Sequence, residues 1–279
     1  MTPNMNNLLL SFFLSVAIAG AAYRAHSLSA SGVVGAIVVG TLTFGLGGLA
    51  WAAVLIAFFV SSSILSHYRL ADKAGLAEKF AKTGQRDLSQ VLANGGWGAA
   101  LAVLSLVVPD RFPLFVAFMG AMAAVNADTW ATELGVLNPR PPRLVTTGRV
   151  VAVGTSGAVS RLGIGATAAG AFLIGLIAVI LAPGGSPAGT VHLWLAPVAL
   201  VAGLGGALFD SLLGATVQGI YWCERDQKET EKRVHGCGER TRLLRGWPWL
   251  NNEWVNFLCS LMGSAVAWAV WTVTCPFFA

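Results

Sequence analysis

Apolar segments long enough to cross a lipid bilayer recur along the chain, and this pattern limits the fold more than any other feature. We expect eight spans, at about 7–23, 28–48, 49–66, 89–108, 112–137, 162–182, 191–222 and 252–274. A helix needs about 20 mostly apolar residues to cross the hydrocarbon core. Only 11% of the residues are charged, about half the share in a soluble domain. The sequence therefore predicts an all-α, polytopic membrane protein in which residues 1–279 form a single transmembrane domain.

The basic residues are concentrated between alternate spans. Of the 18 lysines and arginines, only Arg111 falls on the opposite side of the predicted membrane. The positive-inside rule makes the basic side cytoplasmic, which places both termini on the non-cytoplasmic side. This topology explains the net charge of +5, so we expect no nucleic acid partner. The loops on the basic side are also longer and more polar, and the functional site should face the cytoplasm.

Acidic residues inside apolar segments are the strongest functional signal. Uncompensated charge at membrane depth is costly, so such residues are rare and usually mark sites. In the fifth predicted span, Asn126, Thr129 and Glu133 share a helical stripe, and Asp128 lies off it. Asp128 and Glu133 would meet one ligand only if the helix ends or unwinds near Trp130, or if two partners are served. The alternative is a buried acid paired with an arginine for packing.

The seventh predicted span carries a second carboxylate, Asp210, followed by Ser211 and Gln218. Small residues such as Gly203 and Gly214 lie near the same face, which can therefore approach another helix closely. Magnesium sites use one or two carboxylates together with substrate phosphates. Asp210 is thus a candidate Mg²⁺ ligand, and an interhelical hydrogen bond is the alternative.

The loop at 138–161 could bind phosphate. It combines Arg143, the pair Thr146 and Thr147, and a glycine turn at Gly154–Gly157 that includes Thr155. Glycine turns expose backbone N–H groups, and arginine binds phosphate with two parallel hydrogen bonds. An ordinary basic cytoplasmic loop is the alternative, because the positive-inside rule already accounts for the arginines.

Amides and one more arginine flank two other spans. Gln85, Arg86 and Asn94 surround the start of the fourth span, and Asn252 and Asn256 begin the eighth. These side chains could contact phosphate or base, since helix N-termini attract anions. Helix capping alone is the alternative at both places.

The four cysteines include no C-x-x-C pair. Cys223, His235 and Cys237 could bind zinc, but such loose spacing is a weak signal. We therefore expect the cysteines to be incidental.

The polar stretches resemble the transmembrane protein 19 family, which includes the plant and cyanobacterial phytyl-phosphate kinases. The matching stretches run almost the full length: GQRDLSQVLANG (84–95), NADTWATELG (126–135), PRLVTT (142–147), GTSGAVS (154–160), DSLLGATVQ (210–218) and NNEWVNF (251–257). Two departures are local. The family often has asparagine where Ser156 stands, and aspartate where Leu250 stands, so we expect no metal role at the latter position.

The resemblance implies a kinase that converts an isoprenoid monophosphate, such as phytyl phosphate, to the diphosphate, with a nucleoside triphosphate such as CTP as donor. Its site would face the cytoplasm between the fifth and seventh spans. Asp128, Asp210 and Arg143 would be catalytic, and Asp128, Glu133 and Asp210 would hold Mg²⁺. The other polar positions would bind substrate or nucleotide: Gln85, Arg86, Asn94, Asn126, Thr129, Thr146, Thr147, Gly154, Thr155, Gly157, Ser211, Gln218, Asn252 and Asn256.

Three other functions use the same features. Another Mg²⁺-dependent membrane prenyl or nucleotidyl transferase would need the same acids, but the chain lacks paired D-x-x-x-D motifs. An ion-coupled transporter would use the acids as ion sites, but the polar residues gather towards one face and no inverted repeat is visible. The density of buried acids argues against a scaffold. The sequence leaves open whether the chain forms a homo-oligomer, and it predicts an integral membrane location (the inner membrane in a bacterium).

Overall fold

The computed structural model describes residues 5–69, 84–182 and 191–274, and the described residues contain eight α-helices. They are α1 (Met5–Arg24), α2 (Ala30–Gly47), α3 (Leu49–His67), α5 (Leu88–Leu104), α6 (Phe112–Gly135), α7 (Arg161–Ile180), α8 (Leu195–Thr216, after the 3₁₀ turn Val191–Trp194) and α9 (Asn252–Thr274). Each predicted span overlaps one of these helices. Seven are long and apolar enough to cross a membrane, whereas α5 has only 17 residues. The expected polytopic helical architecture is thus confirmed.

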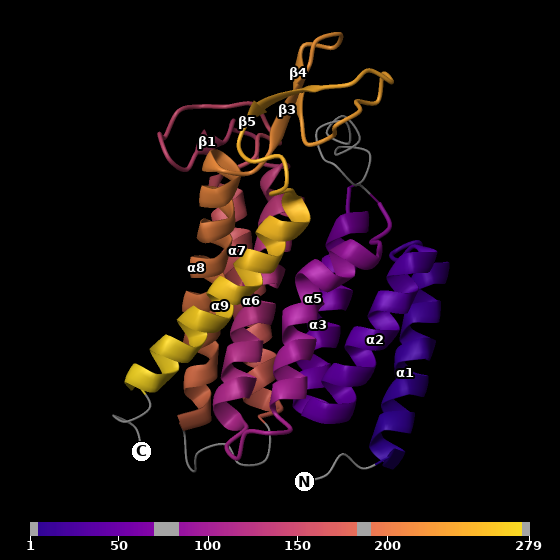
Figure 1. Ribbon diagram of the computed structural model, residues 1–279. Helices are drawn as coiled ribbons and strands as arrows, with labels where there is room; N and C mark the ends of the chain where they lie inside the picture. Colours follow the sequence, from indigo (N-terminus) through magenta and orange to yellow (C-terminus); the bar gives the residue numbers. More distant parts are fainter. Residues whose placement is uncertain (1–4, 70–83, 183–190, 275–279) are drawn as a thin grey trace.

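Helix α6 lies at the centre of the molecule. It packs against α7, α8 and α9 on one side and against α3 and α5 on the other. Within its 18-residue apolar stretch, 78% of the residues are buried. Figure 1 shows α1, α2, α3 and α5 grouped beside the bundle of α6 to α9. A helix buried so fully needs no polar face for water, so polar side chains on α6 must find partners inside the protein.

Small residues allow the helices of this bundle to pack closely. A Cβ atom at Gly120 on α6 would collide with the Gly263 carbonyl of α9, and one at Gly203 on α8 would collide with Ala171 of α7. Dispersion contacts across such close approaches hold membrane helices together, because lipid offers no hydrophobic drive between them.

Short strands form a cap at one end of the helices. The hairpin of β1 (Arg143–Leu144) and β2 (Ala158–Val159) lies beside an antiparallel sheet of order β4-β3-β5, made of β3 (Ile220–Cys223), β4 (Lys228–Thr230) and β5 (Arg242–Arg245). The prediction that the seventh span continues to residue 222 is wrong. Helix α8 ends at Thr216, and the apolar run from Ile220 pairs as a strand, because a short apolar run suits either state.

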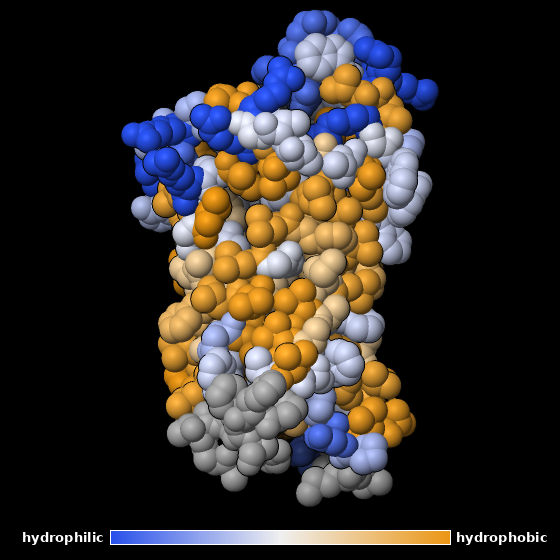
Figure 2. All heavy atoms as spheres, turned by 90° about the vertical axis from the view of Figure 1, so that its left-hand side faces the viewer, coloured by the Kyte–Doolittle hydropathy of each residue, from blue (hydrophilic) through white to orange (hydrophobic). Residues whose placement is uncertain are grey.

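The cap collects the basic loops predicted to share one side. The segments between α6 and α7 and between α8 and α9 both lie there, and α1 begins and α9 ends at the opposite end (Figure 1). Figure 2 shows hydrophilic residues gathered mainly at the cap end, above a broad apolar band. Lys73, Lys79 and Lys82 of the first basic loop lie outside the described residues. The cytoplasmic placement of the cap and the outward placement of the termini stay predictions.

Candidate active site

Two aspartates from different helices lie near each other at the cap end of the bundle. Asp128 of α6 and Asp210 of α8 are close enough to interact electrostatically. The Cys259 thiol of α9 also interacts electrostatically with both carboxyl groups. One turn deeper, Gly206 lies so close to Ala124 that a Cβ atom there would collide. Side chains four residues apart share a helix face, so this close contact aligns the two aspartates just above it.

The Asp210 carboxylate has an unsatisfied oxygen. Its Oδ2 atom is buried and makes no hydrogen bond within the described residues. Buried polar atoms in native proteins are nearly always satisfied, and a carboxylate oxygen can be satisfied only by a donor or a cation. Together with Asp128, this oxygen marks a place suited to a bound cation.

A third acid joins the pair from the cap. Glu231, just after β4, also interacts electrostatically with Asp210. Gln218 is 2% exposed and donates from Nε2 to Glu231 Oε1 at 3.0 Å. The Ser156 hydroxyl donates to Gln218 Oε1 at 2.6 Å. Gln218 therefore joins the glycine turn to the loop after β4, above the end of α8.

Sequence reasoning missed Glu231. The residue lies in KETEK (228–232), within the most basic loop of the chain. Such acids normally pair with surrounding lysines at the surface, so the pattern indicates only solvated charge. The available signal was the alternation of Glu229 and Glu231, which a strand would turn to one face.

The glycine turn rests on the end of α8. Gly154 and Gly157 have φ of +80° and +78°, and a Cβ atom at Gly157 would collide with Ala215 of α8. Arg245 fastens the turn, because its guanidinium donates to Gly214 O at 2.6 Å and to Ser156 O at 3.4 Å. Burial lowers the pKa of Arg245, and the nearby Glu229 carboxylate opposes this shift. The positive φ favours glycine at both positions, and the close approach to Ala215 requires it at Gly157.

A hollow of about 20 Å³ lies between this turn and the sheet. Its lining includes Gly154, Thr155, Ser156 and Ile220, with Glu229 and Glu231 opposite. This volume holds about one water molecule. Two carboxylates would repel a bare phosphate, so an anion would enter this place only together with a cation.

Arg143, Thr146 and Thr147 lie on the solvent side of the cap. All three are exposed, and Arg143 donates to the Gly148 carbonyl at 2.8 Å, which closes its own loop. The catalytic role of Arg143 and the substrate contacts of Thr146 and Thr147 stay predictions.

The other acid of α6 has different neighbours. The helix continues unbroken to Gly135, so Glu133 and Asp128 serve two partners, one of the two outcomes foreseen from the sequence. Glu133 accepts a hydrogen bond from Ser66 of α3 at 2.7 Å. It also opposes the lowering of the Arg86 pKa that burial causes. The structure thus separates Glu133 from the Asp128–Asp210 pair, and we leave it out of the metal site.

Asn126 contributes to helix packing. It is fully buried and accepts hydrogen bonds from Ser61 and Ser62 of α3 at 3.1 and 3.2 Å. Its amide donates to the Gly170 carbonyl of α7 at 2.8 Å. Thr129 donates to the Val125 carbonyl of its own helix at 2.8 Å. These contacts favour a structural role for Asn126 and Thr129 over the predicted substrate contact.

A large apolar cavity lies on the other side of the molecule. Its volume is about 630 Å³, and apolar side chains from α1, α2, α3, α5 and the end of α7 form most of its lining. Arg86, Gln90 and Asn94 also line it, at the cap end of α5. Arg86 donates to Ser63 Oγ at 3.0 Å, while Gln85 lies outside and contacts His26 Nδ1 at 3.0 Å. The cavity is apolar along its length and cationic at one end.

At the start of α9, one asparagine caps the helix and two others lie towards the acidic pair. Asn251 caps the helix, because its Oδ1 accepts from the Trp254 N–H at 3.1 Å. Asn252 and Asn256 lie on the same stripe as Cys259, whose thiol interacts electrostatically with the two aspartates. Both amides, with half-buried Ser211 beside Asp210, are therefore placed at the cap end of the acidic pair.

Comparison with known proteins agrees with the sequence motifs. Residues 13–264 match the family described as integral membrane protein DUF92. The chain belongs to this family. Protein PGR of Arabidopsis thaliana is 32% identical over 274 residues, covering 92% of this chain and 93% of its own length. Protein VTE6, chloroplastic, from the same plant is 30% identical over 269 residues, which is 94% of this chain and 69% of that protein.

Another relative extends the family beyond plants. The uncharacterized membrane protein MJ0933 of Methanocaldococcus jannaschii is 29% identical over 259 residues, covering 93% of this chain and 92% of its own length. No solved structure matches this one. The resemblance found in the motifs is confirmed at the level of the family.

Proposed function

We propose that this chain is a membrane prenyl-phosphate kinase, which transfers the γ-phosphoryl group of a nucleoside triphosphate, CTP being the candidate donor, to an isoprenoid monophosphate such as phytyl phosphate. The observation that carries the proposal is the Asp128–Asp210 pair at the cap end of the helix bundle, in which Asp210 Oδ2 makes no hydrogen bond within the described part of the chain. The resemblance to the phytyl-phosphate kinases gives the reaction class.

The acidic pair fits Mg²⁺. The ion takes oxygen ligands only, and sites that bind phosphate substrates usually use one or two carboxylates. Asp128 and Asp210 would hold it, and Glu231 takes the third place that the sequence assigned to Glu133. Bound there, Mg²⁺ would neutralise charge on the phosphates of donor and acceptor.

The apolar cavity fits the lipid substrate. A prenyl chain is a flexible hydrocarbon, and the lining supplies apolar surface for it. Arg86 stands at the cap end of the cavity, where its guanidinium can pair with the monophosphate. Gln90 and Asn94 supply further hydrogen-bonding groups beside it. The lipid phosphate would thus stay at the end of the molecule where the acidic pair lies.

The donor would bind beneath the cap. Asn252, Asn256 and the glycine turn offer amide and backbone groups near the aspartates. An oxygen of the acceptor monophosphate, already ionised at neutral pH, attacks the γ-phosphorus. The bond from this phosphorus to the bridging oxygen breaks, and the nucleoside diphosphate leaves with the electron pair. No general base is needed, so catalysis rests on positioning and electrostatics.

Label transfer tests this function and separates it from its nearest rival. Purified full-length protein in detergent is incubated with Mg²⁺, a panel of prenyl monophosphates, and CTP labelled at either the γ- or the α-phosphate. We expect label from γ-labelled CTP alone in a lipid diphosphate. Label from α-labelled CTP in the lipid would indicate a nucleotidyl transferase. No transfer from any nucleoside triphosphate to any prenyl monophosphate would contradict the proposal.

A further inference from the structure

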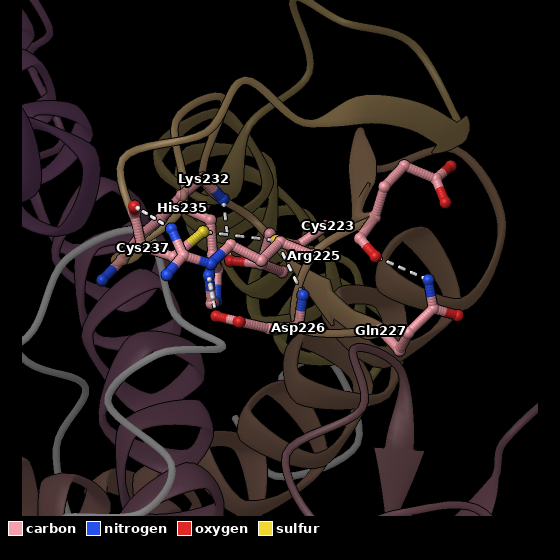
Figure 3. Close-up of polar contacts among 9 residues, drawn as sticks. Cys223, Arg225, Asp226, Gln227, Lys232, His235 and Cys237 are labelled. Atoms are coloured by element: carbon pink, nitrogen blue, oxygen red, sulfur yellow. Dashed lines mark hydrogen bonds and ion pairs between the residues drawn. The ribbon is translucent and has the colours of Figure 1, made fainter.

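A second group of potential ligands lies in the cap, away from the membrane helices. Cys223, Asp226, His235 and Cys237 each offer one ligand atom, and these four atoms lie within 4.8 Å of one another. Figure 3 shows the four side chains converging from two loops of the cap. Cys223 ends β3, Asp226 lies in the turn before β4, and the other two follow β4.

Two distances between these atoms are close to those of a tetrahedral metal site. Zinc bonds sulfur at about 2.3 Å, so two thiolates on one tetrahedral ion lie about 3.8 Å apart. The Cys223 and Cys237 sulfurs are 3.6 Å apart. Nitrogen and oxygen ligands of zinc lie about 3.4 Å apart, and His235 Nδ1 is 3.0 Å from Asp226 Oδ2. A disulfide would need the two sulfurs at about 2.05 Å.

The buried histidine supplies an independent observation. His235 is only 3% exposed, and neither ring nitrogen makes a hydrogen bond within the described residues. Its Nδ1 lies near the Asp226 carboxylate but without the alignment of a hydrogen bond. A buried imidazole without a hydrogen-bonding partner is costly. A cation between these ligands would satisfy the ring and offset the charge of the thiolates and the carboxylate.

Neighbouring groups hold the ligands as in metal sites. The Asp226 N–H points to Cys223 Sγ at 3.5 Å, and Arg225 donates to the Cys237 carbonyl at 3.4 Å. The Gly238 N–H donates to the His235 carbonyl at 2.9 Å, with φ of +89° at Gly238, which tightens the turn holding His235 and Cys237. Such outer contacts orient ligands before the ion binds.

We propose that Cys223, Asp226, His235 and Cys237 bind one structural zinc ion. Two thiolates, an imidazole and a carboxylate are the donors that zinc takes, whereas Mg²⁺ and Ca²⁺ take oxygen alone. Four protein ligands close the coordination shell, so the ion is structural. It links the β3–β4 turn to the segment after β4, which carries Glu231. The weak zinc pattern in the sequence is thus a site, and the expectation of incidental cysteines is not upheld by this geometry.

Zinc content of the tag-free, full-length protein, purified in detergent without chelators, tests the site. We expect about one zinc per chain by elemental mass spectrometry. Cys223→Ser and Cys237→Ser should each reduce zinc to background, and Cys259→Ser, at the buried cysteine of α9, should retain it. Wild-type protein carrying background zinc would contradict the proposal, as would equal zinc in all three variants.

Cobalt substitution covers the case in which the variants fail to fold. The wild-type protein, freed of zinc and given Co²⁺, should show the visible absorption bands of tetrahedral cobalt bound to thiolates. Mass spectrometry without reductant should find Cys223 and Cys237 as free thiols. Absence of the bands, or a Cys223–Cys237 disulfide in the isolated protein, would overturn the assignment. These measurements do not depend on kinase activity, so they test the zinc site separately from the proposed function.

Discussion

The acidic pair of the membrane helices and the mixed cluster of the cap differ in how they are assembled. Asp128 and Asp210 meet because two helices pack through small residues one turn below them. Cys223 and His235 meet because short strands and turns fold the cap onto itself. Helix periodicity can be followed along a sequence, whereas the path of a loop depends on turns and on ligands it binds. The donors also differ: hard oxygens suit Mg²⁺, and thiolates with imidazole suit zinc.

Replacing an aspartate of the pair should have the largest effect. Asp210→Asn and Asp128→Asn each remove a charge from the site, and we expect turnover to fall by about 10³-fold or more. Label transfer per folded protein measures the loss. The matched control is Glu133→Gln, which removes an acid from the same helix but on its α3-facing stripe, and should cost less than about tenfold. Equal losses of turnover in Glu133→Gln and Asp128→Asn would indicate that Glu133 is a metal ligand, as predicted from the sequence.

Removing zinc should loosen the cap and leave the helices intact. A zinc chelator should speed tryptic cleavage at Arg225, Lys228 and Lys232 by about tenfold or more, because the ion holds these loops in place. Circular dichroism should show unchanged helix content. Re-added zinc should restore resistance, and the Cys237→Ser variant should be cut rapidly with or without chelator. Equal cleavage of the wild type with and without chelator would show that no metal ion holds the cap loops in place.

The absence of a side chain at Gly157 should be needed for the cap to pack against α8. Gly157→Ala adds a Cβ atom against Ala215 in a residue with φ of +78°, and we expect a loss of about 1–3 kcal/mol. Gly148→Ala is the control, since its φ is +67° but no described residue lies within 4 Å of the added atom. Thermal unfolding in detergent should show a clearly lower Tm for Gly157→Ala. A matching Tm for both variants would mean that the close contact contributes nothing.

Asn126 should matter for stability and little for chemistry. Asn126→Ala leaves Ser61, Ser62 and the Gly170 carbonyl without their shared partner. Interhelical hydrogen bonds in membranes contribute about 0.6–2 kcal/mol each, so we expect a lowered Tm. Turnover per folded protein should change less than about threefold, well below the loss in Asp210→Asn. A loss as large as that in Asp210→Asn would show that Asn126 contacts substrate after all.

The helical part of the fold could be predicted because bilayer thickness sets the length of each apolar segment. The stripe of Asn126 and Glu133 and the offset of Asp128 also followed from helix periodicity, and the contacts of α6 agree with them. Residues 220–222 were assigned to a helix because a short apolar run carries no period that separates strand from helix.

The cap residues were harder to predict. Glu231 and the ligand cluster depend on which turns bring distant residues together, and the sequence alone does not state this. The family resemblance implied a substrate contact for Asn126. The sequence could not show that its buried partners lie on other helices, at Ser61, Ser62 and Gly170. Polar residues in membrane helices satisfy one another as readily as they bind ligands.

The most direct measurement of the central claim compares wild-type and Asp210→Asn protein in single-turnover label transfer with γ-labelled CTP, a prenyl monophosphate and either Mg²⁺ or a chelator. The account predicts a labelled lipid diphosphate for the wild type with Mg²⁺, and background label in the other three samples. Undiminished transfer by Asp210→Asn, or by the wild type under chelator, would contradict a reaction centred on the two aspartates.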